Sequence, residues 1–120
     1  MSSSQLNKML VEHLPQLKQK YIDEVSWQEG DETGSHTVFG DVLTPYLVEC
    51  ILHNKKDELD KISSFLEAML SLNDDYADEV IALSVLESIA YLFKDDLDLA
   101  EFLGNRARVI LNDFLPPSNN

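Results

Sequence analysis

The chain has 120 residues, 44% of them hydrophobic and 26% charged, and its formal net charge at pH 7 is −13. This length and composition are those of one globular domain and exclude a disordered chain. Direct binding to nucleic acid or to an anionic membrane is excluded as well, because both would repel so acidic a surface.

The lack of a secretory signal and of a membrane span in the sequence predicts a cytoplasmic protein by default. Residues 1–8 lack the basic start and the apolar run of a secretory signal, and no apolar stretch is long enough to span a membrane. Cys50 has no second cysteine to pair with, and its apolar neighbours favour a buried structural thiol. We expect one domain over residues 1–120, with frayed ends at 1–4 and 116–120.

The first quarter of the chain predicts two helical segments. Ser4 can cap a helix whose apolar residues recur at three- and four-residue spacing as far as Leu14. Pro15 then interrupts this pattern and favours a second helix that runs to Val25, because proline is tolerated in a first helical turn.

The next segment predicts a loop. Residues 29–36 contain two glycines, no aliphatic side chain and many local hydrogen-bonding groups, which indicates an exposed connection. A short β-hairpin near 25–39, in which residues 25–27 pair with residues 38–39, is an alternative for this region.

The remainder of the chain predicts four further helices between short polar breaks, over residues 44–53, 57–70, 75–93 and 96–114. Thr44 and Pro45 can begin the first of these, and Asp74 can begin the third, which has little polar face and is expected to be central. Leu99 should face inward in the last one. The fold class is therefore all-α, a single compact bundle of five to six helices.

Acidic residues are concentrated where basic ones are missing. Neither lysine nor arginine occurs in residues 21–54 or 62–93, which hold thirteen of the 22 Asp and Glu residues. Helices that run up and down would gather eight of the carboxylates at one end: Glu29, Asp31, Glu32, Asp41, Asp74, Asp75, Asp78 and Glu79. Compensation of the helix macrodipole explains single carboxylates at helix starts, but it does not require basic residues to be absent. We therefore interpret the set as a face for a positively charged partner.

Three aromatic residues near these carboxylates, Trp27, Phe39 and Tyr76, are candidates for exposed contacts with that partner. Trp27, next to the acidic loop, is the first choice, although a core tryptophan that closes the bundle explains it equally well. We also expect Gly40 and Gly104 to allow a close approach of helices or a bend.

Signatures of catalysis and of metal or cofactor binding are absent from the sequence. His13, His36 and His53 lie far apart, and no nucleophile turn or glycine-rich phosphate loop is present. Glu87, on the most apolar helix, needs a partner and should either meet Lys94, Arg106, Arg108 or a tyrosine hydroxyl or line a small groove. Glu67 is expected to be solvated. We expect no enzyme, with an acid–base site at Glu67 or Glu87 as a minor alternative.

Three segments carry a resemblance to known proteins: residues 39–47 (FGDVLTPYL), 65–69 (FLEAM) and 85–87 (VLE). With the small helical build, they look like a group of uncharacterised bacterial proteins that resemble the immunity partners of polymorphic or contact-dependent toxins. The resemblance extends over about residues 10–111.

This resemblance implies a cytoplasmic antidote whose acidic surface covers the basic active-site face of a cognate toxin domain, commonly a nuclease. The alternative is a helical adaptor or regulatory domain, unrelated to toxins, that binds a partner helix in an apolar groove. The sequence leaves open whether the free protein forms a homodimer.

Overall fold

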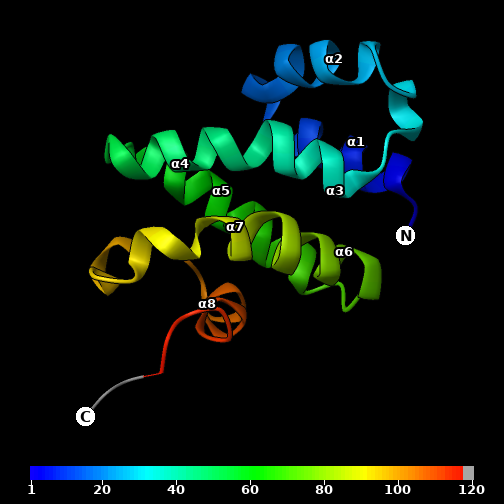
Figure 1. Ribbon diagram of the computed structural model, residues 1–120. Coiled ribbons are helices and arrows are strands. Elements are labelled where there is room, and N and C mark those ends of the chain that lie inside the picture. Colours follow the sequence, from blue (N-terminus) through cyan, green and yellow to red (C-terminus); the bar gives the residue numbers. More distant parts are fainter. Residues whose placement is uncertain (118–120) are drawn as a thin grey trace.

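Six helical rods follow one another along residues 1–117, which are the residues that the computed structural model describes (Figure 1). The rods are α1 (Ser3–His13), η1 with α2 (Pro15–Leu17 and Lys18–Ser26), α3 with η3 and α4 (Ser35–Val38, Phe39–Leu43 and Thr44–Leu52), α5 (Lys56–Leu70), α6 with η4, α7 and η5 (Asp75–Val80, Ile81–Leu86, Glu87–Ile89 and Ala90–Phe93), and α8 (Asn105–Asn112). Two short 3₁₀ turns, η2 (Gly30–Glu32) and η6 (Leu97–Ala100), lie in the connections.

The prediction of an all-α bundle of five to six helices is confirmed. Residues 1–117 contain no strand, so the alternative hairpin near 25–39 is wrong. Residues 38 and 39 lie instead inside a helical rod, where both side chains are fully buried. Figure 1 shows the α3–α4 and α6–α7 rods side by side and running in the same direction, with α2 above them and α8 below.

Helix α1 begins earlier than predicted. Ser2, and not Ser4, is its N-cap: the Ser2 hydroxyl accepts a hydrogen bond from the Gln5 N–H, and the Gln5 side chain accepts one from the Ser2 N–H. This reciprocal capping box satisfies two N–H groups that the helix leaves free. Residues 3 and 4, in the first segment predicted to be frayed, are part of this helix, and residues 118–120 of the second predicted segment, 116–120, lie outside the described residues.

The third rod begins at Ser35, nine residues before the predicted start at Thr44, and Pro45 lies inside it. Proline has no N–H and crowds the carbonyl four residues earlier, which normally breaks a helix. Here the turn before it widens to a π-helix, in which the Thr44 N–H bonds to the Phe39 carbonyl. The Thr44 hydroxyl, expected as a cap, donates instead to the Ser84 carbonyl at 2.7 Å, in the π-helical segment η4.

The fourth and fifth rods follow the prediction more closely. Helix α5 spans Lys56–Leu70, and the chain then turns at Asn73, whose φ is 54°, before Asp74 caps α6 by accepting from the Ala77 N–H. The fifth rod is not buried all round, because Leu83 and Tyr91 are 47% and 65% exposed.

The last helix is shorter than predicted. The Asp96 side chain accepts from the Asp98 N–H and starts only the 3₁₀ turn η6, in which Leu99 is 40% exposed rather than inward. Helix α8 begins after Gly104.

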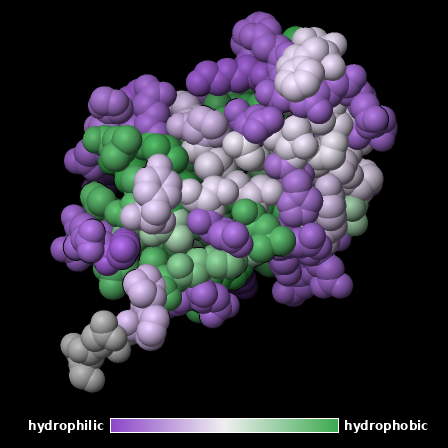
Figure 2. Space-filling view, in the orientation of Figure 1, coloured by the Kyte–Doolittle hydropathy of each residue, from purple (hydrophilic) through white to green (hydrophobic). Residues whose placement is uncertain are grey.

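The core extends through all six rods and has Phe39, Phe65 and Phe93 among its fully buried side chains. Cys50 is buried in it, as predicted. Figure 2 shows hydrophilic residues over most of the upper part of the molecule, above and around α2, and hydrophobic residues at the surface in the left and lower parts. None of the helices in residues 1–117 combines the length and the apolar character needed to cross a bilayer.

Candidate functional site

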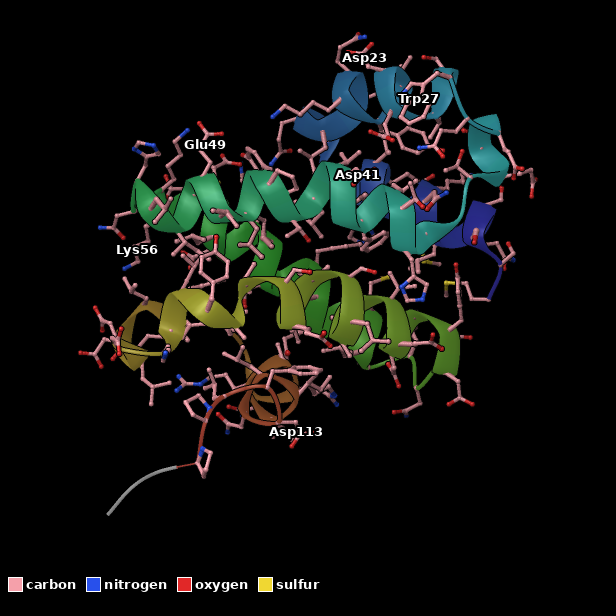
Figure 3. The ribbon with its side chains drawn as sticks, viewed as in Figure 1. Asp23, Trp27, Asp41, Glu49, Lys56 and Asp113 are labelled. Atoms are coloured by element: carbon pink, nitrogen blue, oxygen red, sulfur yellow. The ribbon has the colours of Figure 1, made fainter. Side chains whose placement is uncertain are left out.

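Trp27 is the most exposed of the large hydrophobic residues, at 71% of its surface. It follows directly after α2, and Figure 3 shows it projecting with Asp23 from the upper edge of the molecule, above Asp41 on the third rod. We use the name acidic corner for Trp27 together with the exposed carboxylates that surround it in the sequence and on the neighbouring rod: Asp23, Glu29, Asp31, Glu32 and Asp41.

The acidic corner is held by a buried polar network. The Asn7 side chain, fully buried in α1, donates to the Thr33 carbonyl at 2.8 Å, and its oxygen accepts from the Ser35 hydroxyl at 2.8 Å. The Tyr21 hydroxyl donates to the Asp31 carboxylate at 2.7 Å, and burial together with this contact raises the pKa of Tyr21. The segment predicted as an exposed loop is thus partly buried, at Thr33 and Ser35, and has a defined shape.

Sequence reasoning missed Asn7. The signal was a polar residue among the apolar positions of the first helix, directly after the buried Leu6. A buried amide must find partners, and those of Asn7 lie 26 and 28 residues away in the chain.

The start of α6 carries the second group of predicted carboxylates, Asp74, Asp75, Asp78 and Glu79. The Tyr76 hydroxyl joins this helix start to α1 and α3, since it lies 2.7 Å from the Ser3 hydroxyl and accepts from the Ser35 N–H at 3.2 Å. The carboxylates of residues 29–32 and those at the start of α6 therefore lie at the same end of the molecule, near the N-terminus (Figure 1), whereas Asp41 lies farther along the third rod.

Two carboxylates of this second group, Asp74 and Glu79, have partners in the structure that the lack of nearby lysine and arginine in the sequence does not indicate. Asp74 accepts from the Met1 ammonium and from the Ala77 N–H, both at 2.9 Å, and these contacts lower its pKa. Glu79 lies 3.3 Å from His36. Asp75 is exposed, and no ion pair of Asp75 is found in the described part of the chain.

His36 connects Glu79 to Ser84: its Nε2 is 3.3 Å from Glu79 Oε1 and its Nδ1 is 2.7 Å from Ser84 Oγ. Serine, histidine and a carboxylate also form the nucleophile triads of hydrolases. Such a site needs backbone or side-chain donors for an oxyanion, but Ser84 lies within a helical rod, where N–H groups bond to the preceding turn. The three residues are best explained as a link between α3 and the fifth rod.

Asp78 differs from its neighbours. Its Oδ1 is buried and has no hydrogen-bond partner within residues 1–117. Burial, followed by the charges of Asp75 and Asp74, raises the pKa of this carboxyl. Asp78 lines an open pocket of about 630 Å³ between α5, the fifth rod and α8.

Two of the three aromatic candidates are excluded as free contact residues. Phe39 is fully buried and stacks on Phe65, with ring centroids 6.1 Å apart, because the third rod is one continuous helix that turns this side chain into the core. Tyr76 is half-buried, and its hydroxyl is occupied by Ser3 and Ser35. Trp27 alone of the three is exposed.

Glu67 and Glu87 both differ from expectation. Glu67 is 23% exposed and not simply solvated: its two oxygens accept from the Arg106 and Ala107 N–H groups at 3.1 and 2.9 Å, which caps α8 from another helix. Glu87 is exposed and needs no partner. Gly104 leaves room for the Glu67 cap of α8, because a Cβ at position 104 would lie only 2.3 Å from Glu67 Cγ. This is the close approach of helices that was predicted for Gly104.

Comparison with known proteins gives a family but no activity. No curated protein and no solved structure is significantly similar to the chain. Residues 7–115 match the model of a domain of unknown function, DUF7674, so the match covers the helical body from within α1 to three residues beyond the end of α8. The chain therefore belongs to the DUF7674 family.

Proposed function

We propose that this protein is an immunity or inhibitor-type protein that binds a basic partner, a cognate toxin domain such as a nuclease, and occludes its active-site face. The observation that carries the proposal is the 71% exposure of Trp27 within the acidic corner. Tryptophan is the residue most enriched among the energetic centres of protein interfaces. An indole left in water among carboxylates therefore marks a surface that a partner covers.

The charge of the acidic corner fits a nucleic-acid enzyme as that partner. A nuclease must attract phosphates and presents lysine and arginine around its active site. Residues 21–54, which contain all six residues of the acidic corner, hold seven acidic residues and no lysine or arginine. Complementary carboxylates can occupy the phosphate sites and accelerate association by electrostatic steering.

The network of Asn7 also supports binding, because it fixes the backbone of the acidic corner before a partner arrives. Ordering a loop on association reduces affinity, and a loop that is already ordered avoids that loss. The buried Thr33 and Ser35 hold the segment that carries Glu29, Asp31 and Glu32.

The alternative function is a helical adaptor, and one observation favours it. Leu83 and Tyr91 are exposed on the fifth rod, and the exposed Glu87 lies between them in the sequence. Exposed apolar side chains of this kind can contact a partner helix without any contribution from the acidic corner.

Calorimetric titration distinguishes the two functions. The titrant is the catalytically disabled product of the neighbouring gene, if that gene encodes a protein with a basic C-terminal domain, and the titration is run at low and at high salt. An inhibitor forms a one-to-one complex that weakens with salt, and Trp27→Ala costs about 2 kcal/mol or more of binding free energy, about thirtyfold in Kd. Tyr91→Ala is the matched control, since Tyr91 is 65% exposed on another rod.

The outcome for the two variants decides between the functions. If Tyr91→Ala weakens the complex and Trp27→Ala does not, the adaptor function is correct. If the neighbouring product does not bind at either salt concentration, it is not the partner, and the inhibitor proposal loses its main support.

A further inference from the structure

An apolar surface that the proposed function does not use lies at the end of the molecule opposite residues 29–32 and the start of α6. The last turn of α4, the first turn of α5 and the 3₁₀ turn η6 meet there, at the left in Figure 1. We use the name apolar end for its three exposed leucines, Leu52, Leu97 and Leu99, which are 64%, 53% and 40% exposed. Figure 2 shows hydrophobic residues at the surface in this part of the molecule.

A groove of about 410 Å³ adjoins the apolar end, between α4, α5 and η6. Its floor is apolar, because Ile51 and Leu59, which are 5% and 6% exposed, line it together with the half-buried Phe102. Leu99 lines the same groove. The exposed leucines and the groove therefore form one continuous apolar surface, which is typical of an interaction site.

Charges of both signs surround this groove. Lys56 lines it together with the exposed Asp98 and Glu101, and Figure 3 shows Lys56 between the end of α4 and the η6 turn. None of these three side chains forms an ion pair within residues 1–117. They are therefore available to charges on another molecule.

This distribution of charge fits a second copy of the same chain. In a two-fold dimer a surface meets itself, so it must supply both members of every ion pair that crosses the interface. The apolar end can do so, since Lys56 of one copy can face Asp98 or Glu101 of the other, and the reverse. The acidic corner cannot, because residues 21–54 hold no lysine or arginine and two such surfaces repel each other.

We propose that the apolar end binds a second copy of this chain in a two-fold dimer. The exposed leucines of each copy pack against the groove of the other, and Lys56 faces the carboxylates on the opposite side. This inference goes beyond the proposed function and does not depend on it. The acidic corners lie away from the interface, so each copy in the dimer can still bind a basic partner.

The dimer should be weak, and salt should strengthen it. Three leucines and one groove are less than a standard interface of roughly 800 Å² per partner, so we expect a Kd of about 100 µM. Each copy also has a net charge of −13, and the long-range repulsion between two copies is screened as salt is added. The complex with a basic partner has the opposite dependence and weakens with salt.

The test is sedimentation equilibrium of the full chain from about 10 µM to about 1 mM, at about 0.05 M and 0.5 M NaCl. The average mass should rise from that of one chain towards that of two, with a Kd several-fold lower at the higher salt concentration. Spectra of ¹⁵N-labelled protein over the same concentrations should show shifts of the amides in residues 51–60 and 94–102, but not in residues 27–32.

Variants at exposed positions locate the interface. Leu97→Glu should raise the Kd of the dimer at least tenfold, because it places a charge in the apolar end. Leu72→Glu is the matched control and should leave the Kd within about twofold, since Leu72 is 48% exposed but follows the far end of α5. Lys56→Glu keeps all three leucines and should raise the Kd several-fold, through the lost cation and the added like charge.

Three results would overturn the inference. The first is the mass of a single chain at 1 mM together with unchanged spectra. The second is an equal effect of Leu97→Glu and Leu72→Glu, which would indicate only a response to net charge. The third is a dimer that weakens with salt and is lost in Trp27→Ala, because the acidic corner of one copy would then contact lysines of the other. No toxin is present in these measurements, so they decide on the dimer whether or not the inhibitor function is correct.

Discussion

Replacement of Gly104 by alanine tests how α8 is attached to the bundle. Gly104 has a φ of −74°, which any residue adopts, so alanine introduces no backbone strain there. Its Cβ, however, would lie 2.3 Å from Cγ and 2.4 Å from Cδ of Glu67 and must displace this side chain. The Glu67 carboxylate would then lose its hydrogen bonds to the Arg106 and Ala107 N–H groups.

The expected loss follows from these two bonds. Removal of an N-cap costs roughly 0.5–2 kcal/mol, and hydrogen bonds to charged groups contribute roughly 1.5–3 kcal/mol. We therefore expect Gly104→Ala to lower the free energy of unfolding by about 2 kcal/mol in urea denaturation. Gly34→Ala is the control, because its φ is −55° and no atom lies within 4 Å of the added Cβ, so its effect should stay within about 0.5 kcal/mol.

A double-mutant cycle makes this prediction specific. In the background Glu67→Ala, the side chain that would clash is gone, and Gly104→Ala should be neutral or stabilise the fold by reducing the entropy of the unfolded chain, by roughly 0.4–1 kcal/mol. If Gly104→Ala destabilises the protein equally in both backgrounds, or no more than Gly34→Ala does, then Glu67 is not the cap of α8.

Three further predictions concern buried polar groups. Asp78→Asn should raise the free energy of unfolding at neutral pH by about 1 kcal/mol, measured in urea. The folded-state pKa of Asp78 is raised, so its carboxyl does not destabilise the fold below the ordinary Asp pKa, and the destabilisation is complete once pH has risen through the raised pKa. The stability gained by Asp78→Asn should therefore vanish in acid, and a gain that persists there would contradict the assignment. Asn7→Leu should cost about 1–3 kcal/mol, because it leaves the Thr33 carbonyl buried without its donor, and hydrogen exchange should increase in residues 29–35 but not in α8. Thr44→Val should cost about 1 kcal/mol through the lost bond to the Ser84 carbonyl, and a thermal melt unchanged from that of the parent would show that this bond contributes nothing.

The parts of the fold that were predictable from the sequence depend on neighbours in the chain. Helix α5 was predicted because its apolar residues recur at helical spacing, and its observed bounds, Lys56–Leu70, differ by one residue from the prediction. Asp74 was predicted to start α6 because an N-cap interacts with residues only three positions away. Both signals lie within one or two helical turns.

The errors arose where contacts between distant residues decide the structure. Proline is normally found in the first turn of a helix, which is why Pro45 was predicted near a helix start. The π-helical turn before Pro45 contacts the fifth rod and keeps the third rod continuous. The cap of α8 comes from Glu67, 40 residues before Ala107, so no local pattern at Gly104 could reveal it. The same limit applies to the candidate site: the sequence indicated the acidic segments and Trp27, but not the burial of Phe39 or the unpaired oxygen of Asp78.

The most direct test of the inhibitor function uses Trp27 itself, which is the only tryptophan of the chain. Protein labelled with 5-fluorotryptophan gives one ¹⁹F signal, which can be followed while the unlabelled basic partner is added. The account predicts that the signal shifts in a one-to-one titration and that Trp27, now 71% exposed, becomes protected from a soluble quencher in the complex. A complex that forms while the Trp27 signal and its accessibility remain those of the free protein would contradict the account.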